Sequence, residues 1–82
     1  MKVEVDFVAE EVMEMLQSRI AADLKVKIEH ELKNDLALDS LDMLDLANEV
    51  ETSFDVILSD DAIYEVKTVL DLIQMVKSGL EE

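Results

Sequence analysis

Several residue types that constrain a fold are missing or rare in this sequence. It has no cysteine, which excludes a disulfide framework and thiolate chemistry by the chain's own side chains. It also has no proline and a single glycine, so few residues would interrupt helices built from its abundant leucine, methionine, alanine and glutamate. No apolar run approaches the roughly 18 residues that a membrane span requires. The opening "MKVEVDFVAEEV" lacks the apolar region of a signal peptide, so we expect a cytoplasmic protein without a membrane partner.

Positive charge is scarce as well. Seven lysine and arginine residues stand against 21 aspartates and glutamates, which gives a net charge of −14. Nucleic acids and anionic membrane surfaces would repel such a chain, so its partners are expected to carry basic patches. Half of the 82 residues are apolar, enough for collapse into one small domain spanning residues 1–82. We expect this domain to be a monomer.

The first expected helix runs from Phe7 to Leu24, with Asp6 as its N-cap. Its apolar face repeats every four residues, at Val8, Val12, Leu16, Ile20 and Leu24. The next segment, residues 25–38, is interrupted by charged and polar residues, which favours a connecting loop held over the core by its apolar side chains. Those side chains are Ile28, Leu32, Leu36 and Leu38. The four-residue spacing of the first three would suit a short helix equally well.

A second helix is expected to begin after Asp39. Asp39 lies three residues before Asp42, a variant of the capping box in which an aspartate replaces the usual glutamate. The apolar residues that follow at steps of three or four are Leu41, Leu44, Ala47, Val50 and Phe54. The acids that occupy the remaining surface are Asp42, Asp45, Glu49 and Glu51.

Two further helices complete the pattern. A short one starts after Ser59 and runs from Asp60 towards Val66. The last one is capped by Thr68, with Asp71 forming a second box, and its apolar stripe comprises Val69, Leu72, Ile73, Val76 and Leu80. Gly79 suits a left-handed position at its C-terminal end. The predicted fold class is all-α: a small four-helix bundle of three long helices and one short helix.

Ser40 is the first residue of the expected second helix, where its side chain would point outward. The N-terminal end of a helix carries unsatisfied amides and a partial positive charge, so a phosphodiester built on this hydroxyl would lie in a favourable field. The flanking Asp39 and Asp42 oppose an anion, but they offer carboxylates to magnesium and to basic side chains of a modifying enzyme. A serine near a helix start can also be purely structural, since cap preference alone explains it. The residues by themselves leave both interpretations open.

A longer stretch, "DLALDSLDMLDLANEVETSFDVILSDDAIYEVKTVLDLIQMV" at residues 35–76, resembles the acyl carrier protein family. The resemblance depends on "DSLD" at 39–42, "FD" at 54–55, "SDDA" at 59–62 and "TV" at 68–69. These motifs match the family's spacing from the serine without a gap. The first helix also resembles the family's first helix, so the likeness extends over nearly the whole chain.

The resemblance implies a specific chemistry. Acyl carrier proteins are four-helix bundles whose motif serine is esterified with 4′-phosphopantetheine by a transferase that uses coenzyme A. The thiol of this arm carries acyl groups as thioesters. On this sequence the implied attachment site is Ser40, with no catalytic residue and no metal site, and the protein is not an enzyme. The implied role is fatty-acid biosynthesis or the synthesis of related lipids or secondary metabolites.

The acidic surface fits the same family. No lysine or arginine lies between Lys33 and Lys67, whereas many acids do. Such a field speeds and orients encounters with basic surfaces more than it tightens them. The implied partners are a phosphopantetheinyl transferase and acyl-transferring, synthase or ligase enzymes with basic patches. The residues expected to be recognised are Asp39, Leu41, Asp42, Asp45 and Glu51, with Asp45 and Glu51 facing solvent.

Two alternatives remain at this stage. Ala37 stands where many members have glycine and Ser59 where proline is common, which leaves open a specialised carrier of aminoacyl or polyketide type for a dedicated ligase or synthase. The alternative from another class is an acidic helical interaction module without a prosthetic group, in which Ser40 is merely a cap.

Overall fold

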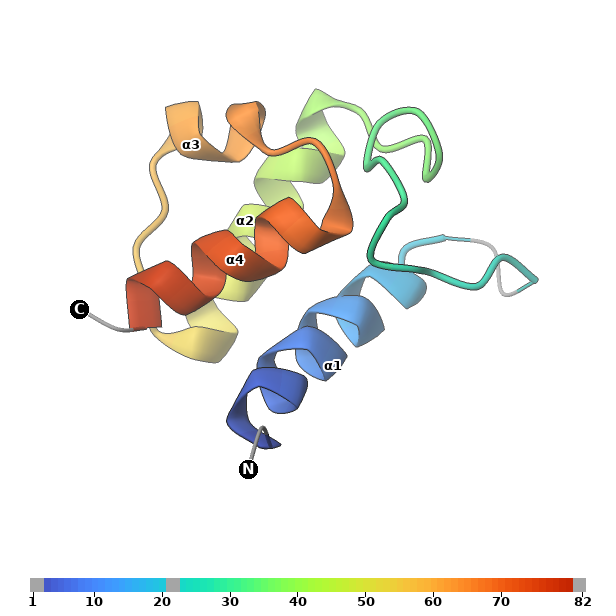
Figure 1. Cartoon of the computed structure of the whole chain (residues 1–82). Helices are drawn as coiled ribbons and strands as arrows, with labels where there is room; N and C mark the ends of the chain where they lie inside the picture. The colour runs from blue at the N-terminus through green and yellow to red at the C-terminus, as the bar shows by residue number, and fades with distance from the viewer. Residues whose placement is uncertain (1–2, 21–22, 81–82) are drawn as a thin grey trace.

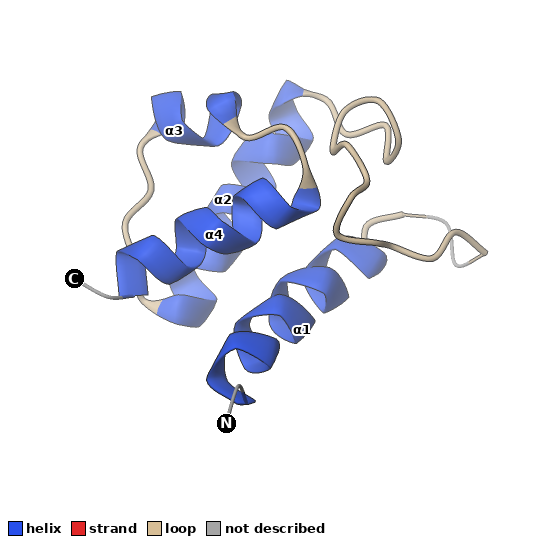
Figure 2. Cartoon of the chain, in the orientation of Figure 1, coloured by secondary structure: helices blue, strands red, loops and turns tan. Residues whose placement is uncertain are grey.

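The computed structural model describes residues 3–20 and 23–80 and shows four helices there (Figure 1). The helices are α1 (Val3–Gln17), α2 (Ser40–Phe54), α3 (Asp60–Glu65) and α4 (Val69–Leu80). Figure 2 shows loops and helices but no strand within the described ranges, which confirms the all-α class with three long helices and one short one. Among these helices, none combines the length and apolarity needed to cross a membrane.

The core lies where α1, α2 and α4 meet. Helix α1 packs against α4 and α2, while α2 also contacts α3 and α4. Side chains with almost no exposed area come from all four helices and from the long loop: Val12, Leu16, Leu32, Met43, Leu46, Val50, Ile63, Val69, Leu72, Ile73 and Val76. Burying an aliphatic side chain contributes about 1.5–3 kcal/mol, so this shared core holds the four helices together.

Helix α1 differs from the prediction at both ends. It begins at Val3, so Asp6 lies inside the helix and is not its N-cap. It ends at Gln17 instead of Leu24, because the Gln17 side chain bonds to the backbone of Leu24 and Val26 and turns this segment back towards the helix end. The Gln17 Nε2 donates to the Leu24 carbonyl at 2.7 Å, and its Oε1 accepts from the Val26 amide at 3.2 Å. Leu24 is therefore 37% exposed. The four-residue apolar repeat continues to Leu24, beyond the helix, because a sequence pattern does not show where the chain turns.

The segment 25–38 is a loop, as predicted, and the alternative short helix is not formed. Leu32, Leu36 and Leu38 are buried, whereas Ile28 is 41% exposed, so the prediction of burial is wrong for Ile28. The loop pairs with the segment around the start of α4 through three backbone hydrogen bonds. They join the Leu32 amide to Lys67 O (2.8 Å), the Val69 amide to His30 O (3.0 Å) and the Leu70 amide to Ile28 O (2.9 Å).

The predicted apolar stripe of helix α2 is confirmed at Ala47 and Val50 but not at its other three positions. Its buried residues are Met43, Leu46, Ala47 and Val50. Leu41 is 73% exposed, and Leu44 and Phe54 are only partly buried. The start of α2 is apolar at so many positions that steps of three or four describe more than one face. Which face is buried is decided by where the other helices lie.

Helices α3 and α4 begin where the sequence indicates. The Ser59 Oγ accepts from the Ala62 amide at 3.1 Å. In the predicted box of α4, the Thr68 Oγ1 accepts from the Asp71 amide at 3.1 Å, and the Asp71 Oδ2 accepts from the Thr68 amide at 3.2 Å. Leu80 at the end of the predicted stripe is exposed.

Gly79 does not have the predicted left-handed conformation. It lies within α4, and its φ is not positive. A Cβ at this position would lie 3.4 Å from the Val56 Cγ1, which is ordinary contact distance. Gly79 thus lies directly against the α2–α3 loop, and the helix continues past it to Leu80.

Candidate functional site

The N-terminal end of α2 is capped by the predicted pair of aspartates. Asp39 has extended backbone angles (φ −99°, ψ −173°), and its Oδ1 accepts from the Asp42 amide at 2.9 Å. In return, the Asp42 Oδ2 accepts from the Asp39 amide at 3.1 Å. A box of this kind satisfies two backbone donors at once. One oxygen of each carboxylate therefore accepts a hydrogen bond from the backbone of its own helix end.

Ser40 is the first residue of α2, and its side chain is exposed. Asp39 acts as the N-cap, and the Ser40 Oγ takes part in no hydrogen bond with the residues that the structure describes. The hydroxyl is therefore not used to cap the helix. This geometry argues against the interpretation of Ser40 as a merely structural serine.

The backbone amides of Ser40 and Leu41 also point to an open helix end. Within the described part of the chain neither amide has a hydrogen-bond acceptor, whereas Asp42 donates to Asp39 Oδ1 and Met43 to the Asp39 carbonyl at 2.9 Å. Free amides at the start of a helix attract anions, phosphate among them. The structure thus presents an exposed hydroxyl beside two free N–H groups.

The loop before Ser40 is held by buried leucines on either side of an unusual residue. Ala37 has a positive φ of 60°, which costs an alanine about 1–2 kcal/mol relative to glycine. Leu36 and Leu38 on either side are buried, and the Leu38 amide donates to the Leu32 carbonyl at 3.0 Å. The residue pattern alone does not predict this turn. The resemblance noted in the sequence offered the available signal, because it implies a glycine at the position of Ala37.

The predicted recognition residues occupy different environments. Asp45 is exposed, as expected, and Leu41 is exposed although the apolar pattern placed it on the buried face. Asp42 is half-buried in the capping box. Glu51 is also half-buried, which contradicts the expectation that it faces solvent. Its Oε2 accepts from the Leu58 amide at 2.7 Å, because the chain after α2 folds back over the side chain. Through this hydrogen bond, Glu51 holds the α2–α3 loop against α2.

One ion pair found in the structure was not predicted. Within the described ranges it is the only one, and it joins the Arg19 Nη2 to the Glu49 Oε1 at 2.7 Å. It links the segment after α1 to the middle of α2, across 30 residues of sequence, so no local pattern could reveal it. A separate question is whether the site could hold a metal ion. The histidine, aspartate and glutamate side chains that the structure describes form no group of three or more that could do so.

Comparison with known proteins connects this geometry to a family. Residues 10–76 match the family model described as "Phosphopantetheine attachment site". The acyl carrier protein of Coprothermobacter proteolyticus is 43% identical over 56 residues, which cover 68% of each chain. The acyl carrier protein of Amoebophilus asiaticus is 32% identical over 74 residues, covering 89% of this chain and 92% of that relative.

Solved structures show the same fold. The crystal structure of an acyl carrier protein from Thermotoga maritima matches with a TM-score of 0.79 and 30% identity, covering 95% of this chain and 92% of that one. A Toxoplasma mitochondrial acyl carrier protein, at 22% identity, matches with a TM-score of 0.85 over the whole of this chain and 97% of its own. The chain therefore belongs to the acyl carrier protein family.

Membership of this family establishes the prosthetic group and the class of function. The protein is an acyl carrier with a covalently attached 4′-phosphopantetheine group, and its family consists of carriers rather than catalysts. Fatty-acid biosynthesis is the usual role of acyl carrier proteins, and the partners of this family are synthases and transferases. The comparisons favour neither the specialised carrier nor the interaction module without a prosthetic group.

Proposed function

We propose that Ser40 is the residue that carries the 4′-phosphopantetheine group. The observation that supports this most is the free hydroxyl at the first position of α2, next to a helix cap made by Asp39. Ser40 also falls inside the matched range 10–76. The site fits a phosphodiester, because the hydroxyl is exposed and the amides of Ser40 and Leu41 beside it are free.

The attachment reaction needs a transferase and coenzyme A. The Ser40 Oγ forms a bond to a phosphorus atom of the diphosphate, the P–O bond to the adenosine bisphosphate portion breaks, and the hydroxyl proton passes to a base on the transferase. The chain itself contributes an ordered loop, an accessible hydroxyl and a helix end that favours the resulting anion. Once attached, the group supplies a thiol that carries acyl groups as thioesters.

Partner enzymes would approach the same end of α2. Leu41 is the large apolar side chain next to Ser40, and Asp45 is an exposed acid one turn further along. We assign the main recognition role to these two residues. Asp39, Asp42 and Glu51 would contribute negative charge, while their carboxylates also accept hydrogen bonds from backbone amides. The transferase and the acyl-transferring, synthase or ligase enzymes would meet this surface with basic patches. The protein would act as a cytoplasmic monomer with one domain spanning residues 1–82.

The test is a mass measurement. Apo-protein incubated with coenzyme A, magnesium and a phosphopantetheinyl transferase should gain the mass of one phosphopantetheine. Ser40→Ala should gain none, while the control Ser53→Ala, which removes another exposed serine of the same helix, should be modified like wild type. Modification of Ser40→Ala, or an unmodified wild type with several broad-specificity transferases, would contradict the proposal.

Recognition is tested by the rate of the same reaction. Asp45→Lys should slow modification at low salt, and the difference should shrink at high salt, because screening weakens electrostatic steering. Equal initial rates for wild type and variant at low salt would remove the recognition role of Asp45.

A further inference from the structure

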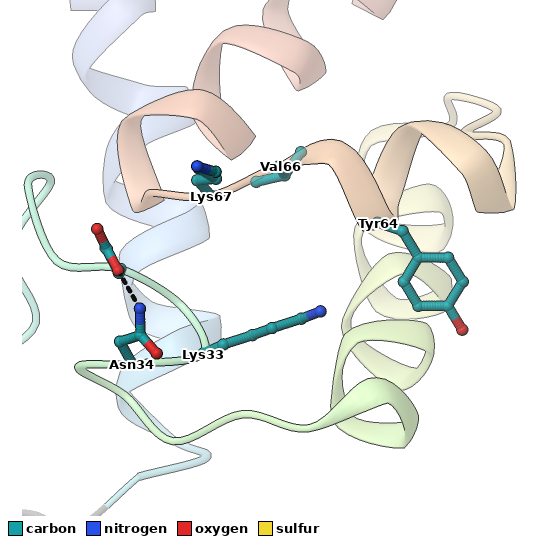
Figure 3. A pocket seen from close by; sticks show the side chains of 6 residues that line it. Lys33, Asn34, Tyr64, Val66 and Lys67 are labelled. Carbon is teal, nitrogen blue, oxygen red and sulfur yellow. Dashed lines mark hydrogen bonds between the residues drawn. The ribbon is translucent and has the colours of Figure 1, made fainter.

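A second feature of the surface is a pocket of about 310 Å³ between the long loop and the segment that joins α3 to α4 (Figure 3). Its lining residues are Glu31, Lys33, Asn34, Tyr64, Val66 and Lys67. Val66 is the one aliphatic residue among them, and the others carry polar or charged groups. The lining therefore presents polar and charged groups beside apolar surface.

The two walls of this pocket are fixed to each other by the backbone. The Leu32 amide donates to the Lys67 carbonyl at 2.8 Å, and Glu31 forms an isolated antiparallel bridge with Thr68. The loop wall is closed on itself, because the Glu31 amide donates to Asp35 Oδ2 at 2.7 Å and the Asp35 amide donates to the Glu31 carbonyl at 2.9 Å. The pocket is therefore formed before any ligand arrives, which lowers the entropic cost of binding.

The charge at this pocket is opposite to that of the molecule. Lys33 and Lys67, which delimit the base-free stretch of the sequence, both line it. Neither forms an ion pair with any acid in the described ranges, although the net charge is −14. The one acid in the lining, Glu31, accepts a hydrogen bond from the Asn34 Nδ2. Figure 3 shows Lys33 extended across the pocket towards Tyr64.

We propose that this pocket binds an anionic group, a phosphate or a carboxylate, presented on the arm attached at Ser40. The proposal rests on the function proposed above. Both walls adjoin α2, because the loop leads directly into that helix and α3, which carries Tyr64, packs against it. The anion has two possible sources: the phosphodiester of the arm itself, or a carboxylate at the end of the carried acyl group. Lysine ammonium groups and a tyrosine hydroxyl can donate hydrogen bonds to either.

The experiment compares four forms of the protein by nuclear magnetic resonance: apo, holo, and holo carrying a butyryl or a succinyl group. We expect the side-chain signals of Lys33, Lys67 and Tyr64 to shift more than those of Lys25 and Lys27 on the loop. A shift common to all three loaded forms assigns the anion to the phosphodiester. A shift confined to the succinyl form assigns it to a carboxylate.

The control uses matched charge changes. Replacing Lys33 and Lys67 together by glutamine should abolish the shift at Tyr64, while replacing Lys25 and Lys27 by glutamine should leave it unchanged, although both pairs lower the net charge equally. Circular dichroism verifies that both variants are folded. Loaded forms whose Lys33, Lys67 and Tyr64 signals match those of the apo-protein would overturn the proposal.

Failure of the pocket is distinguishable from failure of Ser40 as the attachment site, because intact mass reports loading independently. Should the chain not be loaded, the apo-protein is titrated with inorganic phosphate and with succinate to tens of millimolar. A short tether supplies an effective concentration on the order of millimolar, so a functional pocket must respond to free anions in that range. Shifts at Lys33 and Lys67 would support an anion pocket, and their absence would overturn it.

Discussion

Two helices of this protein start with four-residue motifs that share their last two residues, "DSLD" at 39–42 and "TVLD" at 68–71. Both form a capping box between the first and fourth residue of the motif. The second residue differs: Ser40 is exposed, whereas Val69 is fully buried. The same local signal therefore begins an open helix end in α2 and a covered one in α4.

The backbone shows why the two ends differ. In α4 the amides of Val69 and Leu70 donate to carbonyls of the long loop, which lies across that end. In α2 the corresponding amides of Ser40 and Leu41 have no acceptor in the described part of the protein. Capping is thus encoded locally, while availability for chemistry depends on which other segment covers the helix end.

The largest expected contrast is between the two residues that follow the caps. Val69→Ala should lower the free energy of unfolding by about 2 kcal/mol, because it removes two buried methyl groups and leaves a cavity. Ser40→Ala should change it by less than about 0.5 kcal/mol, as is usual for surface substitutions. Urea denaturation followed by circular dichroism measures both. A Ser40→Ala variant as unstable as Val69→Ala would contradict the exposed position of Ser40.

The caps themselves should be equivalent. Asp39→Ala and Thr68→Ala each remove a side chain that accepts from a backbone amide in the first turn, at a cost of about 1 kcal/mol. For a domain of this size the melting temperature should fall by about 4–8 °C in each case. Thermal melts of the two variants test this, and an unchanged melting temperature for Asp39→Ala would mean that the α2 box contributes nothing to stability.

Exposed and half-buried acids of α2 should respond differently to charge reversal. Glu51→Lys loses the hydrogen bond to the Leu58 amide and should destabilise the protein by about 1 kcal/mol. Asp45→Lys should be neutral or slightly stabilising, because it relieves repulsion on an acidic surface. Glu51→Gln serves as the control, since its amide oxygen can still accept from Leu58. Equal stability of Glu51→Lys and wild type in urea denaturation would show that this hydrogen bond is dispensable.

The smallest effect concerns pH. The pKa of Asp71 is lowered, above all by the hydrogen bond from the Thr68 amide. Desolvation of the carboxylate opposes this effect, while the Lys67 amide, the Thr68 hydroxyl and the positive charge of Lys67 lower the pKa further. A depressed pKa in the folded state stabilises the protein above the unfolded-state pKa, and this contribution is lost as pH falls through the folded-state value.

Stability measured from neutral pH to below the ordinary aspartate pKa of 3.8 should therefore fall less steeply in Asp71→Asn than in wild type. Identical pH profiles for the two proteins would contradict a role for this carboxylate at the start of α4.

Signals confined to a few neighbouring residues were predictable from the sequence. The three helix starts at Ser40, Asp60 and Val69 follow from caps three residues away from their partners, and the apolar stripe of α4 follows from its clean periodicity. The end of α1 was not predictable in this way. It depends on Gln17 reaching residues seven and nine positions later.

The surroundings of the site depend on contacts between distant segments. Glu51 looked like another surface acid, but the returning loop brings the Leu58 amide to its carboxylate. The ion pair between Arg19 and Glu49 also requires the tertiary fold. So does the pocket that Lys33 and Lys67 line from opposite walls. The sequence pattern therefore predicts the position of Ser40 at a helix start, whereas the contacts of the neighbouring side chains follow only from the tertiary structure.

The most direct test of the central idea, an open helix end that presents Ser40 for modification, is to map the attachment site. Wild-type protein loaded with coenzyme A and a transferase is digested, and its peptides are analysed by tandem mass spectrometry. We predict a phosphopantetheine on the peptide that contains Ser40 and on no other. Attachment at a different serine, such as Ser53 or the α3 cap Ser59, would contradict the account.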